Sequence, residues 1–292
     1  MNWVVLPALA FWVAVTPVYG KLVVSGPVDR GPKCAYLTVD PTVRRSSFRK
    51  GACTLGGFRT VWNGRQPWTS VYVGSRLAFR YQDASDTRPV SATSGDALWI
   101  YDVYTERGPI LQRWSRATGT LQQEVKFPSR LWRPVIAANS DGAWLMAAPN
   151  GGEDGTQAVA LWHVTSRGVS MVRRGPRAAL WMTARGRTLW LETVTGTHTF
   201  RLWRYDGTRG RLLWTRRQSY LVAPVVGVGA LWTVSGRYCA HSLNVDRIDA
   251  TTGAIATVAT LPQLDCNQLG GAAYFRGAFW FVNGNELERV PG

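Results

Sequence analysis

The stretch VDRIDATTGAIATVATLP, residues 245–262, places a turn of the form Asp-x-x-Thr-Gly between two runs of alternating apolar residues. The side chain of Asp249 can accept hydrogen bonds from the backbone amides that follow it, which stabilises a tight turn. Gly253 supplies the positive φ that closes the hairpin without a steric penalty. The segment therefore predicts a β-hairpin with polar residues at its tip.

This hairpin belongs to a repeat that runs along most of the chain. A tryptophan in a short apolar run recurs at intervals of 45, 46, 42 and 48 residues, at Trp99, Trp144, Trp190, Trp232 and Trp280. A turn glycine follows the first four of these tryptophans by 20 to 24 residues, at Gly119, Gly168, Gly210 and Gly253. A period of 40 to 50 residues built from short strands predicts a β-propeller with one four-stranded blade per repeat.

The two ends of the chain suggest how the ring of blades closes. The last repeat stops at NELERVPG without its turn and outermost strand, and a hairpin at residues 34–53 has no tryptophan strand before it. Pairing of these ends would remove both exposed sheet edges. We therefore expect about six blades, the sixth shared between the termini. The irregular region 58–92 leaves five or seven blades open.

The composition supports one large all-β domain. The 292 residues are 46% hydrophobic and 18% charged, which indicates a folded protein. Thirty glycines, fifteen prolines and fifteen tryptophans point to many turns and short aromatic-rich strands. After Gly20 no apolar pattern of helical period continues without a glycine or proline.

The sequences of the repeats resemble those of the YVTN-type and streptogramin-lyase-like propellers of bacterial envelope proteins. The matching segments are Gly-Ala-Leu-Trp at 229–232 and Arg-Ile-Asp-Ala-Thr-Thr-Gly at 247–253, and the resemblance covers roughly residues 93–290. It implies a propeller fold that serves binding proteins and enzymes alike. The lyases of this group use magnesium and a histidine base, but their site matches none of His163, His198 and His241. His163 occupies the slot of a strand residue in its repeat.

Four cysteines, Cys34, Cys53, Cys239 and Cys266, bracket two predicted hairpins. Cysteines at the two ends of one hairpin lie on neighbouring strands, within reach of a disulfide if the register suits. We therefore expect the bridges 34–53 and 239–266, and with them an oxidising compartment. The alternative is four buried free thiols.

The first twenty residues contain no charged side chain. They are long enough for the core of a signal peptide or for a slightly short membrane span. Lys21 and Arg30 follow the apolar run instead of preceding it, which departs from a simple signal. We expect a signal peptide or membrane anchor at 1–20, a linker at 21–33 and the propeller at 34–292, located outside the cytoplasm.

The formal net charge is +16, and the positive charge is concentrated between residues 167 and 217, where twelve arginines face two acidic residues. Such a surface attracts anionic cell-wall polymers or lipid in a salt-dependent manner. The same segment interleaves arginines with Trp181, Trp190, Trp203 and Trp214. Because the repeat assigns these tryptophans largely to blade packing, nucleic acid is not the expected partner.

No motif identifies a catalytic residue, a metal ligand or a cofactor-binding residue. The first hypothesis is a non-catalytic, exported or membrane-anchored propeller that binds an envelope ligand or partner at one mouth of its channel. The second is an envelope enzyme, a lyase or hydrolase, that uses carboxylates, with or without a metal, at that mouth. The carboxylates open to that role are Asp96, Asp102, Asp141, Glu153, Asp154, Glu192, Asp206 and Asp265.

Overall fold

The computed structural model describes most of the chain. The described residues are 2–5, 14–18, 20–27, 33–42, 45–52, 58–62, 68–82, 89–102, 105–127, 131–139, 141–149, 158–176, 179–195, 199–207, 209–217, 220–237, 239–264 and 269–292. Throughout these ranges the secondary structure is strand and turn, without a helix. The all-β prediction is confirmed.

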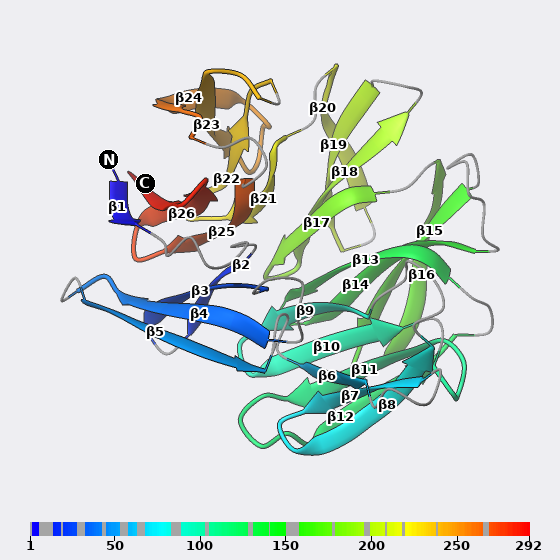
Figure 1. The fold of residues 1–292 in the computed structure, drawn as a ribbon. Helices are drawn as coiled ribbons and strands as arrows, with labels where there is room; N and C mark the ends of the chain where they lie inside the picture. The colour runs from blue at the N-terminus through cyan, green and yellow to red at the C-terminus, as the bar shows by residue number, and fades with distance from the viewer. Residues whose placement is uncertain are drawn as a thin grey trace. The chain divides into compact units, whose positions relative to one another are not determined.

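The strands form seven antiparallel sheets, and consecutive strands lie side by side in each (Figure 1). Contacts divide the chain into two compact units, one of residues 56–218 and one of residues 1–55 with 219–292. A series of small sheets with this strand order is the blade arrangement of a β-propeller. The fold is therefore a seven-bladed propeller, which confirms the predicted fold; seven lies within the predicted range of five to seven blades and is one more than the count of six.

Residues 56–218 hold four of the sheets. The first has three strands, β6 (Arg59–Trp62), β7 (Trp68–Val73) and β8 (Arg76–Gln82). The second has β9 (Val90–Ser94), β10 (Ala97–Asp102), β11 (Ile110–Ser115) and β12 (Leu121–Lys126). The third has β13 (Leu131–Asn139), β14 (Gly142–Pro149), β15 (Ala158–Thr165) and β16 (Gly168–Pro176). The fourth has β17 (Ala179–Arg185), β18 (Thr188–Thr195), β19 (Thr199–Asp206) and β20 (Arg209–Arg216).

The other unit holds three sheets. One consists of β2 (Ala14–Val18), β3 (Lys21–Pro27), β4 (Lys33–Asp40) and β5 (Arg45–Ala52). The next consists of β21 (Val222–Val226), β22 (Ala230–Ser235), β23 (Ser242–Asp249) and β24 (Ile255–Pro262). The last contains β25 (Leu269–Phe275), β26 (Ala278–Asn283) and β27 (Glu286–Pro291), and its fourth strand is β1 (Asn2–Val5).

The hairpin at residues 245–262 forms as predicted, between β23 and β24. The Asp249 carboxylate accepts hydrogen bonds from the backbone N–H groups of Thr251, at 2.9 Å, and Thr252, at 2.6 Å. These bonds favour the charged form and hold the pKa of Asp249 below its usual value. Gly253 closes the turn with a φ of 80°.

The repeated tryptophans lie in the second strand of their sheets and are buried. Their side chains are at most 5% exposed, at Trp99, Trp144, Trp190, Trp232 and Trp280. Trp99 packs among residues of β14 and β15, Trp144 packs against β18, and Trp280 packs against β3 and β4. The prediction that these tryptophans pack between neighbouring blades is confirmed for these three.

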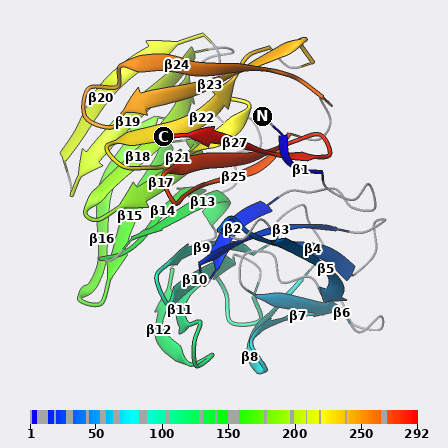
Figure 2. The same cartoon turned by 90° about the vertical axis from the view of Figure 1, so that its left-hand side faces the viewer.

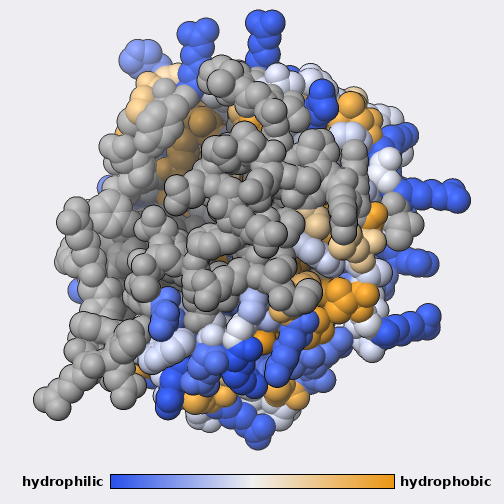
Figure 3. All heavy atoms as spheres, turned by 90° about the vertical axis from the view of Figure 1, so that its right-hand side faces the viewer, coloured by the Kyte–Doolittle hydropathy of each residue, from blue (hydrophilic) through white to orange (hydrophobic). Residues whose placement is uncertain are grey.

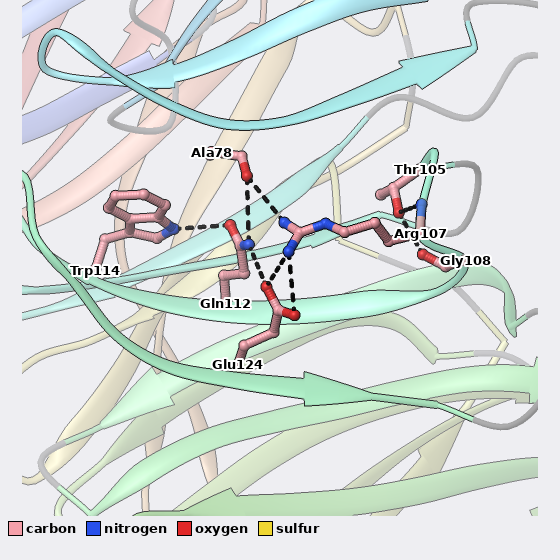
Figure 4. Close-up of polar contacts among 7 residues, drawn as sticks. All are labelled: Ala78, Thr105, Arg107, Gly108, Gln112, Trp114 and Glu124. Carbon is pink, nitrogen blue, oxygen red and sulfur yellow. Dashed lines mark hydrogen bonds and ion pairs between the residues drawn. The ribbon is translucent and has the colours of Figure 1, made fainter.

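The sheet that the sequence did not predict is β6–β8, and a polar network fastens it to the sheet β9–β12 (Figure 4). The backbone carbonyl of Ala78 in β8 accepts hydrogen bonds from Gln112 Nε2, at 3.4 Å, and from Arg107 Nη2, at 3.2 Å. Gln112 is fully buried; its Nε2 also donates to Glu124, at 2.7 Å, and its Oε1 accepts from Trp114 Nε1, at 2.9 Å. Every polar group of the Gln112 side chain therefore has a partner.

The N-terminal strand completes the sheet of the C-terminal strands. β1 pairs antiparallel with β27, with Asn2 opposite Glu288 and Val5 opposite Glu286 (Figure 2). The predicted pairing of terminal strands is confirmed, but the partner is β1 and not the 34–53 hairpin, whose strands β4 and β5 belong to the sheet β2–β5. The sheet that contains this hairpin already has four strands, because β2 and β3 precede the hairpin in the chain and belong to the same sheet.

Strands β1 and β2 lie within residues 1–20, and β3 begins at Lys21. The sheets thus extend into the two segments that we expected to precede the propeller. Val15 of β2 is 6% exposed and packs in a core with Leu22, Ala273 and Trp280. The signal peptide or membrane anchor at residues 1–20 stays a prediction; cleavage after Gly20 would take a strand from each of two sheets. Among the described residues, no helical segment has the length and hydrophobicity of a membrane span.

We predict that a protein beginning at Lys21 unfolds at a clearly lower urea concentration than the full chain. The deletion removes Val15 from its core and exposes the backbone hydrogen-bonding groups of β27 that β1 satisfies. Urea titration followed by tryptophan fluorescence measures the difference. Equal midpoints for the two proteins would show that β1 and β2 add nothing to the fold.

Candidate functional site

A recess of about 130 Å³ lies between the sheets β9–β12 and β13–β16. It is placed at the ends of the strands that carry the buried Trp99 and Trp144. Its lining comes from both sheets and consists of Ser94, Asp96, Ala97, Trp99, Arg113, Gln122, Asn139 and Gly142. Asp96 and Gln122 are exposed and mark its solvent side, whereas Asn139 and Gly142 are buried.

One wall pairs an aromatic ring with a cation. Trp99 in β10 lies directly across from Arg113 in β11, and the guanidinium carbon of Arg113 is 5.8 Å from the centroid of the Trp99 ring. A cation within about 6 Å of an indole ring is attracted by the ring's quadrupole. The Arg113 Nε is buried and has no hydrogen-bond partner in the protein. Arg113 therefore retains a buried donor beside the recess.

Asn139 forms the opposite wall, and its two amide atoms have different surroundings. Its Oδ1 accepts hydrogen bonds from the backbone N–H groups of Asp141, at 2.9 Å, and Gly142, at 3.0 Å, which fixes the turn between β13 and β14. Its Nδ2 is buried and has no partner in the protein, although the residue is only 4% exposed. A buried donor without a partner costs about 1–3 kcal/mol. The Asn139 amide is thus oriented by the turn and keeps an unpaired donor.

Asp96 supplies the negative charge at the solvent side. Its carboxylate accepts hydrogen bonds from Ser115 Oγ and from the backbone N–H of Ala117, both at 2.6 Å. The Ser115 bond, followed by the Ala117 bond, holds the pKa of Asp96 below its usual value. Asp96 is therefore ionised at neutral pH, and these bonds tie the turn between β9 and β10, which carries it, to the turn between β11 and β12.

A cross-sheet hydrogen bond ties the two sheets together near the recess. Gln123 Nε2 in β12 donates to the backbone carbonyl of Thr165, at 2.9 Å, and Thr165 lies directly opposite Gly142 in the sheet register. The two walls of the recess are thus held together by a hydrogen bond between residues outside its lining. The arrangement presents buried donors on rigid strands, as a binding site for a hydrogen-bond acceptor requires.

The carboxylates left open by the sequence are dispersed in the described residues. Asp141 lies 3.7 Å from Arg187, Asp206 lies 3.1 Å from Arg204, and Asp102 is buried at the end of β10. Glu192 is fully buried, accepts a hydrogen bond from Trp181 Nε1 at 2.8 Å and lies 3.6 Å from Arg216. Asp96 alone among them lines the recess. Glu153, Asp154 and Asp265 lie outside the described residues.

The histidines are not brought together. His163 is a residue of strand β15, as predicted, and its ring stacks on Trp144 with centroids 4.0 Å apart. Burial lowers its pKa, so the ring is neutral at neutral pH. His241 is exposed just before β23, and His198 lies outside the described residues. No group of three potential metal-ligating side chains occurs within the described ranges.

The predicted cysteine hairpins are present, as β4–β5 and β23–β24. Cys34 is fully buried in β4, and Cys239 lies in a turn with a φ of 59°. Neither of these two cysteines is a free thiol. Cys53 and Cys266 lie outside the described residues, so the pairings 34–53 and 239–266 stay predictions.

The sequence does not predict the recess. It offers Asp96 only as one of the carboxylates open to a role at a channel mouth, and it indicates no role for Arg113 or Asn139. The one local signal was the segment Asn-Ser-Asp-Gly at 139–142, whose composition favours a side-chain-capped turn. The meeting of Asn139 with Arg113 depends on the packing of two sheets.

The fold is shared with a solved propeller. The β-propeller domain of the Trilobed protease from Pyrococcus furiosus, described as having an open velcro topology, is 10% identical and superposes with a TM-score of 0.64. The match covers 97% of this chain and 98% of that one. It supports the fold-level resemblance to propeller proteins that the repeats suggested. No family model and no curated protein sequence matches the chain.

We predict that Gly142→Ala destabilises the protein by about 1–3 kcal/mol, the usual cost of overpacking. A Cβ at this position would clash with the carbonyl oxygen of Val164, and the backbone there cannot move without separating β14 from β15. Gly186→Ala is the matched control, because its φ of 55° is also positive but the added methyl meets nothing within 4 Å. Thermal unfolding compares the two, and an equal loss in both would contradict the close approach at Gly142.

Proposed function

We propose that this protein is a non-catalytic β-propeller of the cell envelope that binds a ligand, and that the recess between β9–β12 and β13–β16 is its binding site. The observation that carries the proposal is the pair of buried donors, Arg113 Nε and Asn139 Nδ2, that have no partner in the protein and belong to residues lining one recess. Two such groups on neighbouring sheets lower the stability of the empty protein and strengthen its binding of an acceptor.

The lining favours binding over catalysis. General acid–base catalysis uses a group whose pKa lies near the working pH. Asp96 is held in its ionised form, and the remaining polar side chains of the lining belong to serine, arginine, glutamine and asparagine. These side chains recognise a molecule without exchanging protons with it. The envelope lyase or hydrolase, our alternative, would have to use groups outside this recess.

The cysteines support an extracytoplasmic location. The two hairpins that they flank are formed, and the two described cysteines are not free thiols. Disulfides persist in oxidising compartments, so a bridged protein belongs outside the cytoplasm. Because β1 and β2 are strands of the fold, the proposed exported protein retains residues 1–20.

The arginine-rich segment 167–217 supports contact with anionic wall polymers or lipid. Among the arginines of this segment whose burial the structure describes, six are exposed, at positions 167, 185, 187, 209, 211 and 217. Figure 3 shows hydrophilic side chains projecting at several points around the outline of the molecule. Contacts of this kind weaken as salt is added. They would hold the domain near the wall without occupying the recess.

A thermal-shift screen tests the binding function. Wild-type protein is heated with separate panels of organic acids, amino acids, sugars, nucleotides and divalent cations, and hits are incubated with the protein and recovered. We expect one chemical class to raise the melting temperature in a saturable way and to be recovered unchanged. Hits that are chemically converted would support the enzyme, and a screen without any saturable hit would contradict the binding function.

We predict that Cys239→Ser lowers the free energy of unfolding by about 2–5 kcal/mol, the usual loss for a native disulfide. Alkylation of the wild-type protein without reductant, followed by intact mass, should label no thiol. Urea titration of the variant against Ser242→Ala, an exposed neighbour, measures the loss. An unchanged midpoint with four labelled thiols would remove the bridges and the argument for export.

A further inference from the structure

The residues that line the recess restrict the chemistry of its ligand. This inference rests on the binding function proposed above. We propose that it binds a small carboxylate with a single negative charge. The carboxylate oxygens accept hydrogen bonds from Asn139 Nδ2 and the Arg113 guanidinium, and the remainder of the ligand lies against Trp99 and Ala97.

The unsatisfied groups are donors. Asn139 has already committed its oxygen to the turn amides of Asp141 and Gly142, so only its N–H groups are left for a ligand. Arg113 is a donor in every protonation state that it adopts in proteins. A ligand that satisfies both must present acceptors, and a guanidinium favours a planar acceptor with two oxygens. A carboxylate meets both conditions.

The size of the recess restricts the ligand. About 130 Å³ holds only a few non-hydrogen atoms beyond the carboxylate. Trp99 is 1% exposed and Ala97 is 8% exposed, so the apolar part of the lining is small and is fixed by the core. A short aliphatic tail fits this surface, whereas a sugar or a nucleotide would have to remain largely outside.

Asp96 restricts the charge of the ligand. Its carboxylate is held in place by Ser115 and Ala117 at the solvent side of the same recess. With one cation, Arg113, and one anion, Asp96, in the lining, a ligand with one negative charge leaves the recess with a net charge of about −1. The dianionic form of phosphate would add a further negative charge beside Asp96 and would be repelled.

A titration with three probes tests this inference. Propionate, propionamide and inorganic phosphate are added separately to the full-length protein at constant ionic strength, and backbone and side-chain amide resonances are followed by NMR. We expect propionate to shift the Asn139 side-chain resonances in a saturable way. Propionamide, which has the same shape without the charge, and phosphate should bind at least tenfold more weakly.

Two variants and one control locate the binding. Asn139→Asp keeps the oxygen that caps the turn and replaces the donor by an anionic oxygen, so propionate binding should weaken at least tenfold. Arg113→Gln should have a similar effect. Arg167→Gln, at an exposed turn outside the recess, removes the same charge and should leave the affinity within twofold. Amide spectra of the three variants report whether the turn at 139–142 is intact.

Each outcome decides the inference. Equal binding of propionate and propionamide, equal binding of phosphate, or no binding of propionate would overturn the carboxylate assignment. The binding function would still stand if the thermal-shift screen has found a ligand of a different chemical class whose binding Asn139→Asp abolishes. Only the carboxylate assignment would then fall. Propionate binding that survives both Asn139→Asp and Arg113→Gln would place the site elsewhere and would also overturn the inference.

Discussion

The structure depends on strands that are buried on both faces. Every residue of β10 and of β26 is buried, and β22 is buried up to its last residue. Such a strand cannot lie at a surface, so its sheet must be covered on both sides. A buried tryptophan removes 150–250 Å² from water, which corresponds to roughly 4–6 kcal/mol of transfer free energy. One tryptophan in each of five repeats therefore provides a strong driving force for stacking sheet upon sheet.

The same constraint places the candidate site. Strands β10 and β14 are fixed by the packing of Trp99 and Trp144, so the turns that precede them are fixed as well. The turn before β14 orients Asn139, and the turn before β10 carries Asp96. The recess lies where the two stacked sheets approach their ends and side chains no longer fill the space between them. Its donors are rigid because they belong to the core strands and their turns.

The sequence predicted what is encoded locally. The Asp249–Gly253 turn, the second strands with their tryptophans and the two cysteine hairpins each lie within one short segment. The sheet β6–β8 was missed because its middle strand alternates, with Val71 and Val73 buried and no Gly-Ala-Leu-Trp run. It is held instead by Gln112 of the next sheet, a contact that separate sequence segments do not reveal.

The candidate site and the N-terminal strands show two further limits of prediction from the sequence. Arg113 and Asn139 are 26 residues apart in the sequence and lie on different sheets, so only the packing of those sheets brings them to one recess. The uncharged run at 1–20 has the composition of a signal peptide, but it also has that of strands covered on both faces, and composition does not separate the two. The pairing of β1 with β27 joins strands from the two ends of the chain, so neither segment alone encodes it.

The most direct measurement of the central claim is a crystal structure of the full-length protein grown with propionate. The account predicts a carboxylate in the recess, with an oxygen at about 2.7–3.2 Å from Asn139 Nδ2 and another at a similar distance from the Arg113 guanidinium. A recess that holds only ordered water, with Asn139 Nδ2 and Arg113 Nε bonded to protein oxygens, would contradict it.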